Sequence, residues 1–357
     1  MEVVDLIYEA AFVPHLWPDV LQQLANLSDS VGSTVFLFEE AMPTRGVTLG
    51  NLDDLLGEFL ATDSLRFSTS VMRMYGLKPH SFVEVDAYLS AEEIENDPIR
   101  IKLRDLGIGN HICTAIPMPS GELVMYVLQR SLANGGYRDG SVQKLNALRP
   151  HLARAGLIAT KVGFERARST VAAMQAMNLP AAVCSDGKVI ATNPLFQTIP
   201  STICIGSGDR LSSINPTTDV LLQNALMTGR TRDTSDVLSI PISSSERRER
   251  SVMHVLPLKR SARDLFSGGD VLVVLTTVKA TAIVPSPDML SGLFDLTPAE
   301  AALAISLVSG KTLKEGALES EIKDSTARSY LENIFRKTAT NQQSQLVALL
   351  KSASIIR

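Results

Sequence analysis

The sequence predicts a multidomain α+β protein: two domains that each combine a sheet with helices, followed by an all-α domain of four helices. Three observations carry this prediction. Strand-forming runs occur within residues 1–150 and again within 179–283, and helical patterns accompany both sets. A long helical stretch at 151–178 separates the two sets. From residue 296 onward, apolar residues recur only at helical spacing.

The first domain, residues 1–150, is predicted to hold a central sheet with helices on its faces. Residues 6–11 and 17–27 have helical patterns, and residues 33–38 form a strand-like run. The clearest strand is 122–129, which follows a Pro-Ser-Gly turn signal. Residues 112–118 are expected to be its hairpin partner.

The stretch 151–178 is predicted to be a connecting helix, because Leu152, Ala155 and Ala159 lie at helical spacing. It could pack against a second copy of the chain or within its own chain.

The second domain, residues 179–283, has an Asp186-Gly187 hairpin signal, a helical stretch near 219–226, and helices expected on one face of its sheet. The charged run 246–249 is predicted to be a solvated hairpin tip. The predicted strands are 182–184, 189–192, 237–242, 250–257 and 271–278.

Residues 284–294 are predicted to be a linker, and residues 295–357 a four-helix domain. Thr297, Pro298 and Glu300 form a capping-box signal for its first helix, and Gly310 ends that helix. Thr312 can cap a second helix. A fourth helix is expected from about 341 to 352.

The third helix of this domain is predicted to run from Thr326 to about Thr338, with Asp324 and Ser325 as its cap. Ala327, Leu331, Ile334 and Phe335 make one apolar stripe, and polar and basic residues fall opposite it. Two helices joined by a tight turn indicate a helix-turn-helix, whose second helix enters the major groove of DNA. The residues expected at DNA are Lys323, Ser325, Thr326, Arg328, Ser329, Asn333, Arg336 and Lys337.

Within that surface the side chains are expected to have different roles. Arg328 can make a bidentate contact with guanine, which reads sequence. Lys323, Arg336 and Lys337 are better placed for phosphates, which set affinity and register. From these residues the sequence predicts duplex DNA as the partner.

The C-terminal segment resembles the LuxR/GerE-type helix-turn-helix. The resemblance rests on residues 296–301 (LTPAEA), Gly310, Ala317, residues 326–331 (TARSYL), residues 334–335 with Lys337-Thr338, and residues 346–350. It implies a transcription regulator. The chain departs from the family at Gly316, Ser320, Glu321 and Lys323, which replace a usual helix former, core leucine, turn glycine and N-cap serine. The alternative is therefore a protein-binding regulator with a degenerate helix-turn-helix.

The two preceding domains are similar to sensor domains. The element order of residues 179–283 resembles a PAS domain, and residues 1–150 look GAF-like. This order implies regulation by a small ligand or a partner protein, in a homodimer that places two helix-turn-helix modules on DNA. Tyr88 and Asp97-Pro98 also look like part of an acyl-homoserine-lactone pocket, but Glu84 stands where that family has a tryptophan.

Composition sets further limits. Residues 1–160 carry twelve Lys/Arg and twenty Asp/Glu, so this acidic part is not expected to contact nucleic acid. Residues 296–357 carry eight Lys/Arg and six Asp/Glu, which gives the C-terminal domain a net charge of only +2. The scattered cysteines fit buried thiols in a reducing cytosol, and Cys184 is expected in a core rather than as a cofactor attachment point. His111 and Cys113 would share one face of a strand, but two residues make a poor metal site.

No apolar run reaches the length of a transmembrane helix, so a cytoplasmic protein is expected. No P-loop, GxSxG or GxGxxG motif occurs in the right context, so neither an enzyme nor a cofactor-dependent protein is expected.

Overall fold

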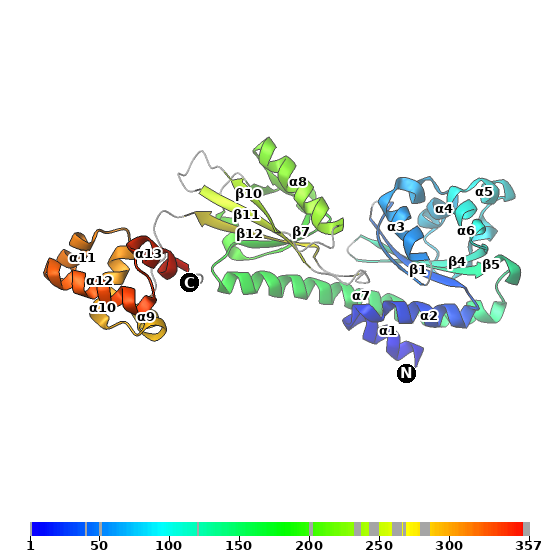
Figure 1. Ribbon diagram of the computed structural model, residues 1–357. Helices are drawn as coiled ribbons and strands as arrows, with labels where there is room; N and C mark the ends of the chain where they lie inside the picture. The colour runs from blue at the N-terminus through cyan, green and yellow to red at the C-terminus, as the bar shows by residue number, and fades with distance from the viewer. Residues whose placement is uncertain are drawn as a thin grey trace.

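The computed structural model describes residues 2–39, 41–49, 52–119, 121–199, 203–231, 237–242, 250–258, 266, 269–278 and 286–352. Over these residues the protein is mixed α/β, with two antiparallel five-stranded sheets, a small two-stranded sheet and a helical C-terminal region (Figure 1). The predicted fold class is confirmed at this level. One long helix, α7 (Asp139–Ala176), contributes to the hydrophobic cores beside both large sheets.

The first sheet has the strand order β2-β1-β5-β4-β3. The predicted strand and hairpin are confirmed, because β1 pairs with β5 and β5 pairs with β4. The prediction missed β2, whose Pro43 and Gly46 are residue types that strands usually exclude. The strands are β1 (Gly32–Glu39), β2 (Met42–Thr48), β3 (Val83–Glu84), β4 (Ile108–Pro117) and β5 (Leu123–Ser131).

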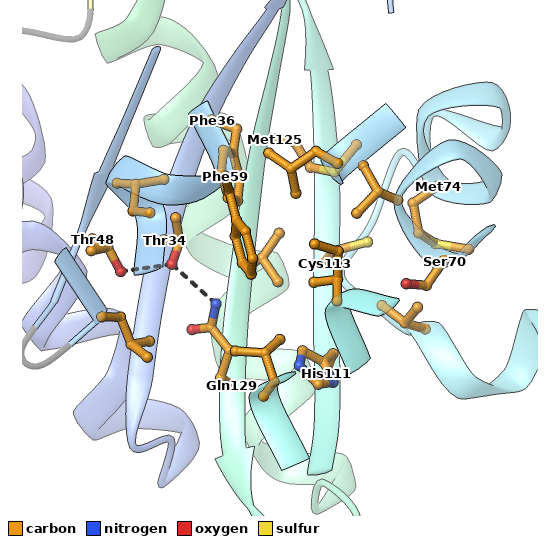
Figure 2. A pocket seen from close by; sticks show the side chains of 18 of the residues that line it. Thr34, Phe36, Thr48, Phe59, Ser70, Met74, His111, Cys113, Met125 and Gln129 are labelled. Atoms are coloured by element: carbon orange, nitrogen blue, oxygen red, sulfur yellow. Dashed lines mark hydrogen bonds between the residues drawn. The ribbon is translucent and has the colours of Figure 1, made fainter. Parts of the chain in front are cut away.

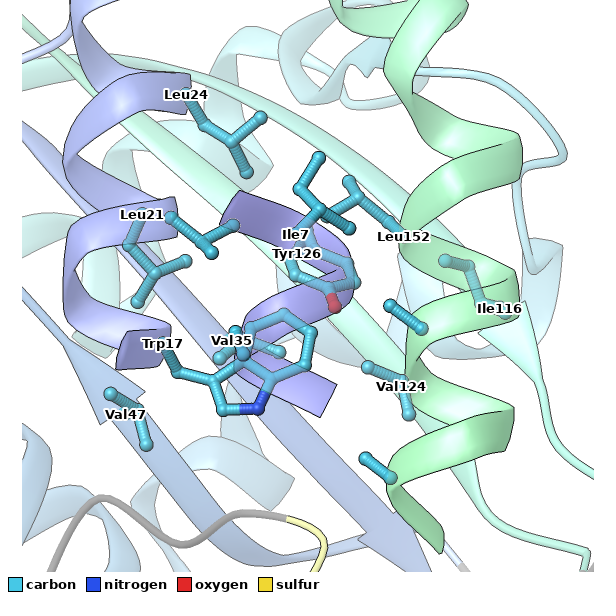
Figure 3. Close-up of a cluster of buried hydrophobic side chains, with 14 of the residues drawn as sticks. Ile7, Trp17, Leu21, Leu24, Val35, Val47, Ile116, Val124, Tyr126 and Leu152 are labelled. Atoms are coloured by element: carbon cyan, nitrogen blue, oxygen red, sulfur yellow. The ribbon is translucent and has the colours of Figure 1, made fainter. Parts of the chain in front are cut away.

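Helices cover both faces of this sheet, as predicted. On one face, α1 (Val3–Phe12), α2 (Trp17–Ser28) and the first half of α7 bury a core around Trp17 and Tyr126 (Figure 3). On the other face lie the helices that surround a cavity described below. They are α3 (Asp53–Ala61), α4 (Thr69–Leu77) and α6 (Pro98–Asp105), with α5 (Ala91–Asn96) directly before α6. The first domain also has 3-10 turns, at Pro14–Leu16 between α1 and α2, and at Asp63–Phe67, Val85–Tyr88 and Leu132–Asn134.

The second sheet has the order β10-β11-β12-β6-β7, and all five predicted strands are present. Asp186 and Gly187 both have positive φ, as a tight hairpin turn requires. The strands are β6 (Ala181–Ser185), β7 (Lys188–Thr192), β10 (Leu238–Ile242), β11 (Arg250–Pro257) and β12 (Val271–Val278). Between β7 and β10 lie the elements at Pro194–Thr198, β8 (Ile203–Ile205), Ser207–Asp209, β9 (Leu211–Ser213) and α8 (Pro216–Thr231).

The prediction that helices cover one face of this second sheet is wrong. Leu222 and Leu226 of α8 pack on one face, and Ala167 and Val171 of α7 pack on the other. The second half of α7 thus serves as a sheet-covering helix within its own chain. The charged run 246–249, predicted to be a hairpin tip, lies outside the described residues.

Ion pairs and one aromatic contact join the two sheet-containing regions. Arg45 on β2 contacts Asp186 and Asp270, with its Nη2 3.2 and 3.4 Å from their Oδ2 atoms. Lys188 pairs with Glu39. The rings of Trp17 and Phe266 also pack together, with centroids 5.2 Å apart. The ion pairs thus attach the edge strand β2 and the end of β1 to the second sheet.

The C-terminal region is helical, with the predicted capping box at its α10, and Thr312, predicted as a helix cap, forms a second capping box. Thr297 with Glu300 caps α10, and Thr312 with Glu315 caps α11. Residues 287–294, predicted to belong to a linker, instead form α9, whose Leu290 is buried in the core of this region. The helices are α9 (Pro287–Phe294), α10 (Pro298–Val308), α11 (Leu313–Glu319), α12 (Asp324–Thr338) and α13 (Gln343–Ser352).

Within the described residues, no single helix has both the length and the hydropathy needed to cross a membrane. Taken together, α9 and α10 would meet those two criteria, with a bend of 112° between them.

Candidate nucleic-acid interface and ligand cavity

The turn between α11 and α12 is a tight helix C-cap. The amide of Ile322 donates to the carbonyl of Ala317 at 3.0 Å, and the amide of Glu321 donates to Leu318 at 3.2 Å, which together form a Schellman motif. Glu321 has a φ of 54°, in the left-handed region that glycine adopts without strain. The turn therefore keeps a glycine-type backbone although its residue is glutamate, at a cost of roughly 1–2 kcal/mol.

The start of α12 differs from the prediction. The helix begins at Asp324, and Lys323 occupies the N-cap without a side-chain cap hydrogen bond. Asp324 and Ser325 are already helical, so the prediction that they cap the helix is wrong. A serine, threonine, asparagine or aspartate at this position could accept a hydrogen bond from a free backbone amide, so the start of α12 lacks that stabilisation.

The two faces of α12 divide as predicted. Ala327 and Ile334 are fully buried, and Leu331 and Phe335 pack against the same core. Several predicted DNA-contacting residues, Lys323, Ser325, Arg328, Ser329 and Arg336, are exposed, whereas Thr326 and Asn333 are half-buried. Arg336 reaches Asn333 at 3.4 Å. The structure thus brings these side chains together along one helix on the surface.

Lys337 differs from the other predicted contact residues. Its ammonium donates to the carboxylate of Glu300 and to the carbonyl of Asp295, both at 2.7 Å. Burial raises the pKa of Glu300, but the hydrogen bonds from Lys337 and at Thr297 outweigh that effect and lower it. Lys337 thus links α12 to the start of α10, and its ammonium is engaged within the domain rather than presented to DNA.

The exposed charge along this surface is balanced. Between residues 321 and 336 the exposed cations are Lys323, Arg328 and Arg336, and the exposed anions are Glu321, Asp324 and Glu332, so the sum is zero. A helix that binds duplex DNA usually has an excess of positive charge. The arrangement can therefore make specific contacts but supplies little general attraction to phosphate.

A second candidate site is a cavity between the first sheet and helices α3, α4 and α6. About 690 Å³ of space free of protein atoms lies there, a volume that includes the part open to solvent. Most of its wall is apolar, including Phe36, Phe59 and Met74 (Figure 2). The polar lining residues are Thr34, Thr48, Ser70, Arg100, His111 and Gln129.

The residues predicted from the lactone resemblance do not line this cavity. Tyr88 is 40% exposed. Asp97 is buried and caps α6, accepting hydrogen bonds from the amides of Ile99 and Arg100. His111 and Cys113 do share one strand face, as predicted, and both line the cavity. Among the described residues no cluster of three or more candidate ligands could hold a metal ion.

Sequence reasoning missed most polar residues of the cavity. Gln129 and Arg130 end an otherwise apolar strand run, and such buried polar residues are the signal that could have marked the site. Thr34 and Thr48 have no comparable signal, since threonine is common in strands.

The buried environment of His111 leads to a prediction about pH. Burial, followed by the nearby Arg100 guanidinium, lowers the pKa of His111 to about 3. In the unfolded chain histidine titrates near 6.5, so between these values acid protonates only the unfolded state. His111 therefore contributes stability above pH 6.5 that is lost as the pH falls toward 3.

Between pH 7 and pH 5 we expect His111 to account for a loss of about 2 kcal/mol in unfolding free energy. The loss would appear in urea unfolding followed by the fluorescence of Trp17, the chain's single tryptophan, which is 1% exposed. H111Q should lose this part of the pH dependence, and H80Q, a change at an exposed histidine, should retain it. Equal pH dependence in wild type and H111Q would contradict the assignment.

Comparison with known proteins gives only distant similarities. No protein-family profile and no curated protein matches the chain. Among solved structures, Escherichia coli SdiA has a TM-score of 0.31 at 11% identity, over 100% of this chain and 94% of that one. The VqsR ligand-binding domain of Pseudomonas aeruginosa has a TM-score of 0.37 at 10% identity, over 45% and 95%. The ligand–DNA complex of Vibrio cholerae VqmA has a TM-score of 0.25 at 14% identity, over 52% and 87%. With TM-scores below 0.5, these similarities carry no argument about this chain.

Proposed function

We propose that this protein is a LuxR-type transcription regulator that binds duplex DNA through α12. The observation that carries the proposal is the exposure of Arg328, Ser325 and Ser329 on one face of a helix whose opposite face is buried. This helix follows a short helix and a tight turn, as in a helix-turn-helix. Arg328 would read a guanine, and Lys323 and Arg336 would contact phosphates.

The proposal includes two sensor regions, a GAF-like one at 1–150 and a PAS-like one at 179–283, before the DNA-binding domain at 295–357. The cavity beside the first sheet would hold a small effector, and the ion pairs of Arg45 would couple that region to the second sheet. In a homodimer the two copies of α12 would reach successive major grooves, about 34 Å apart. Leu157 and Phe164, exposed on α7 seven residues apart, favour α7 as the dimer contact.

A second candidate function is a regulator that binds another protein through this domain and no longer binds DNA. The balanced charge around α12 supports it. So does Leu318 on α11, a large apolar side chain that is 82% exposed beside the turn. The two functions differ in their behaviour toward DNA, because contacts with phosphates make the affinity for DNA fall as the salt concentration rises.

A salt titration of DNA binding tests the proposal. If each copy of a dimer contacts two phosphates, the logarithm of the observed DNA-binding constant should fall with log[salt] with a slope of about −4. A single copy of the chain on DNA should give a slope of about −2. R336A should reduce the slope by about 1 per copy, because it removes a phosphate contact.

Replacing Lys337 is the matched comparison, because this lysine faces Glu300 rather than solvent. K337M should leave the slope unchanged but destabilise the C-terminal domain by about 2–3 kcal/mol, since it leaves a buried carboxylate without its cation. Thermal unfolding followed by circular dichroism measures that loss. DNA binding that does not weaken as salt rises would contradict the proposal, and the absence of DNA binding would support the protein-binding alternative.

A further inference from the structure

We propose that Phe266 couples the second sheet to the core of the first domain, so that the two regions unfold as one unit. Through this contact a rearrangement of the first core would reach β12, the strand that precedes the C-terminal domain. The regulatory role rests on the proposed function, but the coupling itself can be measured without DNA.

The side chain of Phe266 lies in the core of the first domain, although the strands before and after it belong to the second sheet. In the sequence Phe266 stands between β11 and β12, which pair with each other. Its side chain is 7% exposed and belongs to the core around Trp17 and Tyr126 (Figure 3). The rings of Phe266 and Trp17 are tilted by 48°, with centroids 5.2 Å apart, within the range of packed aromatic pairs. A residue of the second region therefore completes the first core.

The helix α7 leaves space beside this contact at Gly156. A Cβ atom there would lie 2.6 Å from Cε of Met118 and 3.5 Å from Cε1 and Cζ of Phe266. The first distance is too short for a real contact, so a larger residue would displace Met118 within a closely packed core. Glycine weakens the interior of a helix, and its presence in α7 agrees with a position that Met118 and Phe266 already fill.

The residues before and after Phe266 are held on the second sheet. The amide of Leu258 donates to the carbonyl of Asp270 at 2.9 Å, and the amide of Asp270 donates to the carbonyl of Cys184 on β6 at 2.7 Å. The strand β12 begins directly after Asp270 and is the middle strand of the sheet. The next helix in the chain is α9 of the C-terminal region. A displacement of Phe266 thus acts on the strand that leads to that region.

Phe266 should contribute more to the coupling than the ion pairs between the two regions. Arg45 and Asp270 are both largely removed from water, so their lost hydration offsets much of their attraction. Lys188, which pairs with Glu39, remains partly exposed, and solvent weakens a pair of that kind. Burial of the Phe266 ring has no such penalty, and it removes a large apolar surface from water.

Urea unfolding of the full-length protein, with one probe in each region, tests the coupling. Trp17, the chain's single tryptophan, reports on the first domain by its fluorescence. A fluorophore on Cys204 reports on the second region, because Cys204 is exposed whereas Cys113 and Cys184 are buried. In wild type we expect both probes to give the same midpoint. In F266A the Trp17 midpoint should fall by about 1 M urea or more, to below the midpoint of the Cys204 probe.

Two matched variants distinguish coupling from a simple loss of packing. L24A opens a cavity in the same core but leaves Phe266 in place, so the midpoints of both probes should fall together. R45M removes the ion pairs of Arg45 and should also leave the two midpoints equal to each other. F266L, a milder truncation, should separate the midpoints by less than F266A does, and it serves if F266A does not fold.

Equal midpoints in F266A or, if that variant does not fold, in F266L would overturn the proposal and assign the coupling to α7, which contributes to both cores. Different midpoints in wild type, or midpoints that separate in L24A or R45M, would also overturn it. A first domain that is unfolded without urea in F266A, beside a folded second region, would support it. Wild-type protein that binds no DNA would remove the regulatory role and leave the coupling intact.

Discussion

Replacing Arg328 by alanine is expected to weaken specific DNA binding by roughly 5- to 150-fold, which corresponds to the 1–3 kcal/mol of one bidentate base contact. Arg328 is exposed near the start of α12, whereas its neighbour Ala327 is completely buried and fixes the rotation of the helix. The loss should be concentrated at one base pair of the site, because an arginine that reads guanine contributes little once that base is changed.

The measurement is a binding titration of wild type and R328A on the preferred duplex and on duplexes altered at each position. R66A, at an exposed arginine in the 3-10 turn Asp63–Phe67 of the first domain, is the control and should bind like wild type. If R328A lost affinity equally for every duplex, Arg328 would be a phosphate contact instead. Unchanged affinity on all duplexes would remove it from the interface.

Replacing Asp97 by alanine is expected to destabilise the first domain by about 3 kcal/mol. The Asp97 side chain is 2% exposed, and its carboxylate accepts hydrogen bonds from the hydroxyls of Ser68 and Ser70 and from three backbone amides. Alanine would remove the cap of α6 and leave buried donors unsatisfied, and each effect costs about 1 kcal/mol or more.

Urea unfolding followed by Trp17 fluorescence measures this loss. D97N keeps one acceptor oxygen but brings an NH2 group toward other donors, so it should lose an intermediate amount, about 1–2 kcal/mol. D105A, at an exposed aspartate on the same helix, should change stability by less than about 0.5 kcal/mol. A loss below 1 kcal/mol for D97A would show that the carboxylate is not the organising group we infer.

The sequence predicted those elements whose signals are local. Thr297 and Glu300 are three residues apart and form the expected capping box, and Asp186-Gly187 forms the expected hairpin turn. The strand β2 was missed because Pro43 and Gly46 contradict strand propensity, and only pairing with β1 makes that segment a strand.

Contacts between distant residues could not be predicted in this way. Lys337 has the position and charge of a phosphate contact in the sequence, but folding places it on Glu300, 37 residues earlier in the chain. Gln129 and Thr34 are 95 residues apart, and only the pairing of β1 with β5 brings them together. The candidate DNA surface was thus largely predictable, whereas the cavity required the tertiary structure.

Genome-wide footprinting with the purified full-length protein tests most directly whether α12 binds duplex DNA. The account predicts discrete protected sites that share a sequence, with protection lost or relaxed for R328A and retained for R66A. Folded protein that protects no site at any concentration, or that protects the same sites with R328A, would contradict it.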